Sequence, residues 1–183
     1  EIIAALKDSA IIILDEAYAE FSAQGSLVEE LKNYPNLIIL RTLSKAYSLA
    51  GVRMGACLCH DESFITFLQQ KIMETYPLPR PAIEAAMIAL APENKKQIQE
   101  NIQKALAETK KLKTYFEKSP LVQTVYPTDA NFILVQFVEG ISAPMVAAYA
   151  AKHGFILRDF STKAETANCL RISPALPEQN DRL

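Results

Sequence analysis

Residues 37–45 read LIILRTLSK, a short apolar run that passes directly into two hydroxyl side chains and a lysine. Residues 10–18 have a similar arrangement, in which AIIIL is followed by DEAY. Short, continuous apolar runs are typical of strands buried in a parallel sheet. Residues 27–33 have a helical pattern, and residues 52–59 are a third strand candidate. A strand, a helix and a strand in this order predict an α/β layer.

The rest of the chain separates into a helical part and a mixed part. We expect helices over residues 62–75, 82–90, 93–118 and 143–153, and strands over residues 122–126, 131–137, 155–157 and 169–172. Prolines exclude a regular helix from residues 76–81, because proline lacks the amide donor. The pattern predicts that residues 1–92 belong to a large, mainly parallel-sheet domain. Residues 93–183 are predicted to form an interdomain helix and a small C-terminal α+β domain.

The composition argues against several classes of function. The chain has 183 residues, is 50% hydrophobic and carries a formal net charge of −2. This charge does not match the basic surface of a nucleic-acid-binding protein. No apolar run approaches the roughly 20 residues that span a bilayer, and the first residues do not resemble a signal or transit segment. Because residue 1 is Glu, we expect the chain to be a piece of a longer protein.

The cysteines indicate neither a disulfide framework nor a metal site. There are three of them, Cys57, Cys59 and Cys169, and an odd number without regular spacing is compatible with a reducing cytoplasm. His60 and His153 are the two histidines, and neither lies at a spacing typical of zinc ligands. We therefore predict a cytoplasmic protein without a metal, in which Cys57 and Cys59 occupy one face of a strand.

Polar side chains follow the two predicted strands where ligands gather in open α/β sheets, beyond the carboxyl ends of the strands. Asp15 follows the first strand, and Thr42, Ser44 and Lys45 follow the second. A lysine shielded from water at such a position is a usable amine nucleophile for an aldehyde. The two hydroxyls can donate hydrogen bonds to a phosphate. Arg53, which lies between two glycines, has the planar fork that suits a phosphate.

Each of these signals is weak by itself, since an acid after a strand or a lysine in a turn is common. Together they match pyridoxal phosphate, which has an aldehyde, a ring nitrogen, a phenolic oxygen and a phosphate. Lys45, Asp15 and Tyr18 provide the amine, the acid and the phenolate donor, and residues 42–53 provide the phosphate donors. A nucleotide phosphate-binding loop is the competing interpretation, but the sequence lacks its glycine-rich pattern with Lys-Ser or Lys-Thr.

The same segments resemble a known family over nearly the whole chain. The matching segments are residues 15–18, 42–55, 76–79, 129–133, 154–159 and 168–172. With them, the chain resembles the class I/II aminotransferases, and within that family the histidinol-phosphate aminotransferases most of all. The resemblance implies an α/β, fold-type I pyridoxal-phosphate transferase and a homodimer whose site is completed by the neighbouring subunit. It also implies that further site residues belong to a missing N-terminal half, so we expect this piece alone to be inactive.

The resemblance assigns roles to the cofactor residues. Lys45 would bond to the cofactor aldehyde and later move a proton between the substrate and the cofactor. Asp15 would pair with the pyridinium nitrogen and Tyr18 with the phenolic oxygen. The phosphate would be bound by Thr42, Ser44 and Arg53. For the substrate, the resemblance implies that Arg171 binds the carboxylate of an amino acid such as glutamate and that Arg158 binds the phosphate of histidinol phosphate.

The implied reaction is transamination between L-histidinol phosphate and 2-oxoglutarate in histidine biosynthesis, so the partners are small amino donors and oxo acids. An aromatic or aspartate aminotransferase, or a phosphothreonine decarboxylase, is the alternative within the same fold. A third interpretation is a binding or regulatory protein that has lost catalysis. The presence of Lys45 argues against this third interpretation, because loss of the lysine would be its expected sign.

Overall fold

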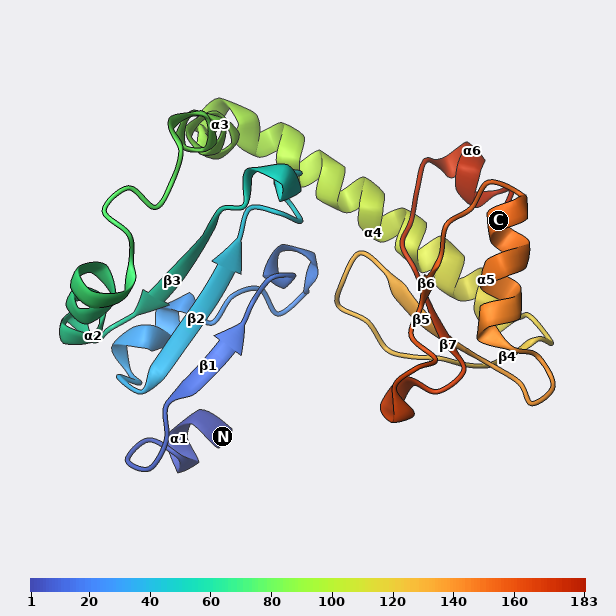
Figure 1. Cartoon of the computed structure of the whole chain (residues 1–183), viewed down its shortest axis with the longest axis horizontal. Helices are drawn as coiled ribbons and strands as arrows, with labels where there is room; N and C mark the ends of the chain where they lie inside the picture. The colour runs from blue at the N-terminus through green and yellow to red at the C-terminus, as the bar shows by residue number, and fades with distance from the viewer. The chain divides into compact units, whose positions relative to one another are not determined.

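The sheet predicted around residues 37–45 is present in the computed structural model, which describes residues 1–183 (Figure 1). The three strands are β1 (Ile12–Asp15), β2 (Leu37–Thr42) and β3 (Gly55–Cys59), in that spatial order. β1 and β2 are parallel, whereas β3 is antiparallel to β2. This sheet lies in the first of two compact units, Glu1–Gln99, and the second unit is Glu100–Leu183.

Helical segments connect and follow these strands. The α-helices of this part are α1 (Ile2–Ala5), α2 (Glu62–Phe67) and α3 (Arg80–Leu90), and the 3-10 helices are η1 (Ala19–Phe21), η2 (Val28–Lys32), η3 (Ala50–Val52) and η5 (Pro92–Asn94). α2 begins at Asp61, whose carboxylate accepts hydrogen bonds from the amides of Ser63 and Phe64. This capping satisfies amides that have no partner within the helix. The single helix predicted over 62–75 is wrong in detail, because α2 passes into a π-helix, η4 (Leu68–Ile72).

The central strand is buried as its composition predicts, but the edge strand is not. Leu37 and Ile39 of β2 are fully buried, and Ile38 is nearly so. In contrast, Ile11 and Ile13 are 66% and 63% exposed, so the prediction of a wholly buried first strand is wrong. Within this chain, β1 pairs with β2 alone.

The second unit contains an antiparallel sheet with two helices on one face. Its strands are β4 (Val122–Val125), β5 (Ile133–Phe137), β6 (Arg158–Asp159) and β7 (Cys169–Ile172), in the order β4-β5-β7-β6. Its helices are α5 (Ala143–Lys152), α6 (Pro177–Asn180) and most of α4 (Lys95–Glu117), which crosses the boundary between the units. The strand predicted over residues 155–157 is displaced, because the chain leaves α5 through Gly154 (φ 90°) and pairing begins only at Arg158.

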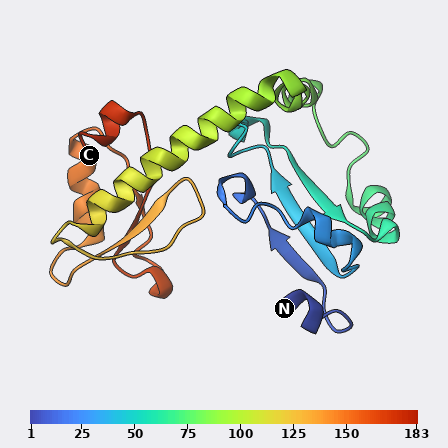
Figure 2. The ribbon, with the colours of Figure 1, turned by 180° about the vertical axis from the view of Figure 1, so that it is seen from behind.

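Alternation along the strands determines which face of this second sheet is the core. Leu170 and Ile172 of β7 are buried together with every second residue of β5. Leu112 of α4 and Ala143 of α5 belong to the same core cluster, so both helices cover this face (Figure 2). Burial of one large aliphatic side chain stabilises a fold by about 1.5–3 kcal/mol. The opposite face therefore remains available to the intervening residues, among them Arg171.

No helix of the structure is both long enough and apolar enough to span a membrane. The three cysteines are free thiols, and the structure has no cluster of potential metal ligands.

Candidate active site

The first group of predicted site residues lies at the carboxyl ends of β1 and β2. Because these strands are parallel, both ends point to the same edge of the sheet (Figure 1). Asp15 ends β1 and is in register with Leu40, and Thr42 ends β2 two residues later. Alternate residues share a face, so Asp15 and Thr42 lie on the same face of the sheet. One oxygen of the Asp15 carboxylate accepts a hydrogen bond from the amide of Ala17 at 3.0 Å, which fixes the turn that follows β1.

Lys45 and Tyr18 come together although they are 27 positions apart, 45 − 18, in the sequence. The Lys45 ammonium nitrogen lies 5.3 Å from the centroid of the Tyr18 ring, within the range of a cation–π contact. Tyr18 is half-buried and packs near Phe21 at 6.3 Å between ring centroids, whereas Lys45 is exposed. The lysine amine is thus accessible and lies beside a phenol that is held by its neighbours.

Two hydroxyls also meet at the end of β2. The Thr42 hydroxyl lies 2.9 Å from the Ser44 hydroxyl and accepts a hydrogen bond from the Ser44 amide at 3.1 Å. A hydroxyl pair and an amide converge here and can serve an anion as donors after a small reorientation. Arg53 lies on the loop before β3, and its guanidinium donates to the Ala50 carbonyl at 2.9 Å. The structure therefore brings Thr42 and Ser44 together, while the described hydrogen bond of Arg53 is within its own loop.

The loop that follows Lys45 contains two strained residues, and the strand after it begins with an obligatory glycine. Ser48 and Arg53 have φ of 58° and 59°, in the left-handed region that side chains other than glycine rarely adopt. A Cβ atom on Gly55 would lie 2.6 Å from the carbonyl oxygen of Arg41, which is closer than real contacts allow. Gly55 thus lets β3 approach β2 beside Thr42, its partner in register.

The second group of predicted site residues, in the second unit, consists of two arginines on neighbouring strands. Arg158 of β6 and Arg171 of β7 are directly opposite each other in the antiparallel ladder. Arg171 is partly buried, with its guanidinium carbon 5.2 Å from the centroid of Phe132 and 5.7 Å from that of Phe160. Its Nε atom is buried without a hydrogen-bond partner. Like charges directly opposite each other destabilise a sheet, so this pair is suited to an anionic ligand.

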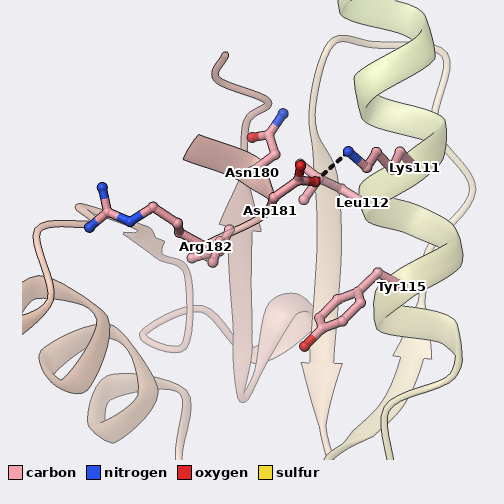
Figure 3. Close-up of a pocket in the computed structure, with 7 residues that line it drawn as sticks. Lys111, Leu112, Tyr115, Asn180, Asp181 and Arg182 are labelled. Atoms are coloured by element: carbon pink, nitrogen blue, oxygen red, sulfur yellow. Dashed lines mark hydrogen bonds and ion pairs between the residues drawn. The ribbon is translucent and has the colours of Figure 1, made fainter. Parts of the chain in front are cut away.

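The described cavities do not contain these arginines. A cavity of about 350 Å³ is lined by Leu157 and Ile172, which precede Arg158 and follow Arg171 in the sequence. The side chains of Leu157 and Ile172 point to the helix-covered face of the sheet. A second cavity of about 320 Å³ lies between α4 and α6 (Figure 3).

Polar contacts in this second cavity join α6 to α4. Lys111 forms an ion pair with Asp181 (Figure 3). The Asn180 amide donates to the Glu108 carboxylate at 2.6 Å. These contacts give the second cavity a structural role, since they attach the last helix to α4, one of the helices that cover the second sheet.

Sequence reasoning missed a set of charged residues on the opposite face of the first sheet. Glu16 and Glu20 both form ion pairs with Arg41, and Glu16 is buried. The only available signal was adjacency, because Glu16 follows Asp15 and Arg41 precedes Thr42. Phe132 and Phe160 were also missed. Their contact with Arg171 depends on which strands pair, which a single sequence does not state.

The first group defines a class of protein: an α/β protein that presents a lysine amine beside a carboxylate, a phenol and hydroxyl donors at the carboxyl edge of parallel strands. Comparison with known proteins then identifies the family. The chain belongs to the aminotransferase class I and II family, whose sequence profile matches residues 1–183. The family resemblance expected from the sequence is confirmed.

Individual relatives refine this family assignment. The chain is 41% identical to the histidinol-phosphate aminotransferase of Aeromonas salmonicida, over 91% of this chain and 46% of that protein. The crystal structure of the histidinol-phosphate aminotransferase from Sinorhizobium meliloti in complex with pyridoxal-5'-phosphate is similar with a TM-score of 0.79 and 30% identity, over 98% of this chain and 49% of that one. The predicted fold class is thereby confirmed.

A further solved structure with the same fold is that of an enzyme with a different name. The L-threonine-O-3-phosphate decarboxylase from Porphyromonas gingivalis is similar with a TM-score of 0.83 and 23% identity, over 98% of this chain and 54% of that one. At this identity, the likeness concerns the fold alone. The chain spans about half the length of the curated relatives it matches.

Proposed function

We propose that the full-length protein is a pyridoxal-phosphate-dependent aminotransferase that transfers an amino group between L-histidinol phosphate and 2-oxoglutarate, in histidine biosynthesis. The observation that carries this proposal is the position of the Lys45 amine, 5.3 Å from the Tyr18 ring. Asp15 and the hydroxyls of Thr42 and Ser44 lie at the same strand ends. The relatives named above support the choice of substrate.

The donor set fits each polar group of pyridoxal phosphate. When bound, this cofactor supplies a conjugated ring that accepts the electrons left by the substrate α-proton. Asp15 would hold a proton on the ring nitrogen, and Tyr18 would donate to the phenolic oxygen. Lys45 would bond to the aldehyde and then carry the proton from the substrate α-carbon. These roles need an acid, a phenol and an amine close together, and the position of Asp15 at the end of β1 and the contact between Lys45 and Tyr18 support this arrangement.

The phosphate of the cofactor would be bound by Thr42, Ser44 and Arg53. The two hydroxyls already lie 2.9 Å apart, and the Ser44 amide points at one of them. Arg53 would exchange its bond to the Ala50 carbonyl for a bond to the phosphate in which both partners are charged. This bond offsets part of the strain of its left-handed backbone.

Substrate anions would be bound by the two arginines of the second unit. Arg171 would bind the carboxylate of glutamate, because its fork accommodates two carboxylate oxygens and two phenyl rings restrict its movement. Arg158 would bind the phosphate of histidinol phosphate, since it is exposed and opposite Arg171. A bound anion would also relieve the repulsion between the two guanidinium groups.

We also propose the setting in which this activity operates. The unit Glu1–Gln99 would belong to the large cofactor-binding domain, predicted as residues 1–92, and the unit Glu100–Leu183 to the small domain. The family resemblance supports a homodimer, and free Cys57, Cys59 and Cys169 are compatible with the cytoplasm.

A single-turnover experiment tests the proposed substrate. The full-length protein is loaded with pyridoxal phosphate and mixed separately with L-histidinol phosphate, L-aspartate, L-phenylalanine or phosphothreonine, and the absorbance of the lysine-bound cofactor is followed. Rapid loss of this absorbance with histidinol phosphate alone is expected. Comparable loss with aspartate or phenylalanine would indicate a broader aminotransferase, and carbon dioxide release from phosphothreonine would indicate a decarboxylase. Absence of the lysine-bound absorbance in the loaded protein would refute the cofactor assignment.

A further inference from the structure

Glu16 is a buried carboxylate that makes no predicted contact with the cofactor. It is 7% exposed, and three partners surround it. The Ser26 hydroxyl donates to it at 2.6 Å, the Leu27 amide at 2.7 Å and the Arg41 guanidinium at 3.4 Å. Buried charges are normally paired or bonded in this way, because transfer of an unpaired charge out of water is costly. Glu16 therefore joins the loop at residues 26–27 to β2.

Arg41 extends this set of contacts to a second carboxylate. Its other terminal nitrogen lies 2.6 Å from the carboxylate of Glu20, which is 11% exposed. Burial by itself lowers the pKa of the Arg41 guanidinium, but the hydrogen bond and charge of Glu20 and the charge of Glu16 outweigh burial, so this pKa is raised. Arg41 thus stays charged and connects two acids that lie four residues apart, 20 − 16, in the segment after β1.

The network also reaches the segment that follows Lys45. Burial raises the pKa of the Tyr47 phenol, and the nearby charge of Glu20 raises it further while Arg41 lowers it. Tyr47 is therefore within electrostatic range of both members of the ion pair between Arg41 and Glu20.

Strand geometry places this network directly behind the proposed cofactor residues. The Glu16 amide donates to the Leu40 carbonyl at 2.9 Å, which extends the parallel ladder by one residue. Side chains alternate along each strand, so Glu16 and Arg41 project to the face opposite Asp15 and Thr42. Glu16 thus shares a peptide bond with Asp15, and Arg41 shares one with Thr42, and neither has a role assigned above toward the cofactor.

We propose that Glu16, Arg41 and Glu20 form a positioning network that holds the turn containing Asp15 and Tyr18 at a fixed separation from the segment containing Thr42 and Lys45. This inference rests on the proposed cofactor site. A cofactor that bonds to both segments binds best when their separation is already set. Residues behind a binding site that orient the binding side chains commonly change affinity or activity by about 10- to 100-fold when they are altered. The network joins these two segments through side-chain contacts on the face of the sheet opposite Asp15 and Thr42.

The test uses Arg41→Gln in the full-length protein, with Arg80→Gln as the matched control. Arg80 forms one exposed ion pair with Glu84, so each change removes one arginine from the same unit, but only Arg41→Gln removes the two ion pairs with Glu16 and Glu20. The measurements are the dissociation constant of pyridoxal phosphate and the induced circular dichroism of the bound cofactor, which reports its fixed orientation. Arg41→Gln is expected to weaken binding by about tenfold or more and to reduce the induced signal. The control is expected to change neither.

Glu20→Gln keeps the test decisive if Arg41→Gln does not fold. It removes the Glu20 charge while the pair between Arg41 and Glu16 remains, so about a threefold loss of cofactor affinity is expected, within the range for a single ordinary hydrogen bond. Affinity and induced signal equal to those of Arg80→Gln, in whichever of the two variants folds, would overturn the positioning role. Lys45→Ala separates this failure from that of the proposed function. If Lys45→Ala gives the same cofactor spectrum as the unaltered protein, the cofactor site itself is wrongly assigned.

Discussion

Replacement of Arg171 by lysine is the most direct test of substrate recognition. The change keeps the positive charge and removes the planar fork that can bind both oxygens of a carboxylate. It also removes the contacts of the guanidinium with Phe132 and Phe160, whose ring centroids lie 5.2 and 5.7 Å away. We expect the fold to persist, because the Nε atom that is lost has no hydrogen-bond partner in the structure.

The magnitude follows from these contacts. Loss of one of two charge-assisted hydrogen bonds costs about 1.5–3 kcal/mol. The looser placement of the ammonium group between the rings adds about 0.5 kcal/mol. A total of about 2–3.5 kcal/mol corresponds to roughly a 30- to 300-fold decrease in kcat/KM, because about 1.4 kcal/mol is a factor of ten. The decrease should be found for L-glutamate, whose carboxylate is the proposed ligand.

The assay compares kcat/KM for L-glutamate in the full-length, cofactor-loaded protein with Arg182→Lys as the matched control. Arg182 also lies over a phenyl ring, that of Phe155 at 5.7 Å, in the same unit, and has no proposed role. Arg182→Lys should therefore leave kcat/KM nearly unchanged. A decrease of less than about threefold for Arg171→Lys, or one no larger than that of the control, would refute carboxylate binding by Arg171.

Three further predictions concern the first unit. Lys45→Ala should abolish turnover and leave the free energy of unfolding nearly unchanged, because the exposed amine serves chemistry rather than packing; normal turnover in a steady-state assay would contradict its role. Asp15→Asn should lower kcat by weakening the protonation of the ring nitrogen, and an unchanged kcat would remove Asp15 from that role. Gly55→Ala should destabilise the protein by about 1–3 kcal/mol in urea unfolding, because its Cβ would lie 2.6 Å from the Arg41 carbonyl. Gly51→Ala is the control, since no atom lies within 4 Å of its Cβ, and equal stability of the two variants would show that β3 can move away from β2.

Much of the first sheet could be predicted because its central strand has a composition that few other structures tolerate. Leu37, Ile38 and Ile39 are consecutive and buried, as a central strand requires. The exposure of Ile13 could not be predicted, because an apolar run does not state whether its strand is central or at an edge. The π-helical turn Leu68–Ile72 was likewise outside the prediction, because its apolar spacing also fits an α-helix.

The candidate site was predictable where function depends on position along a strand. Asp15 and Lys45 follow apolar runs, and the rule that ligands gather at carboxyl strand ends then predicts that they lie at the same edge of the sheet. The register of distant segments could not be predicted in the same way. Arg171 meets Phe132 and Phe160 only because β7 lies between β5 and β6, and Arg41 meets Glu16 only because β1 and β2 pair in one particular register.

Residues with a left-handed backbone fall into two kinds, those that the fold compensates with hydrogen bonds and those whose strain is related to function. Three non-glycine residues, Ser48, Arg53 and Asn168, have left-handed backbones. Asn168 has a structural explanation, since its side chain accepts a hydrogen bond from the Ala143 amide and donates to the carbonyls of Phe137 and Ile141.

The side chain of Arg53 makes one hydrogen bond, to the Ala50 carbonyl of its own loop. Ser48 and Arg53 lie in the loop after Lys45, and the opposed arginines with an unpartnered Nε atom lie on the open face of the second sheet. Natural sequences retain such costs mainly where function requires them. The two places therefore coincide with the proposed cofactor phosphate site and the proposed substrate anion site for a physical reason, because bound anions would supply the contacts that the protein itself leaves unmade.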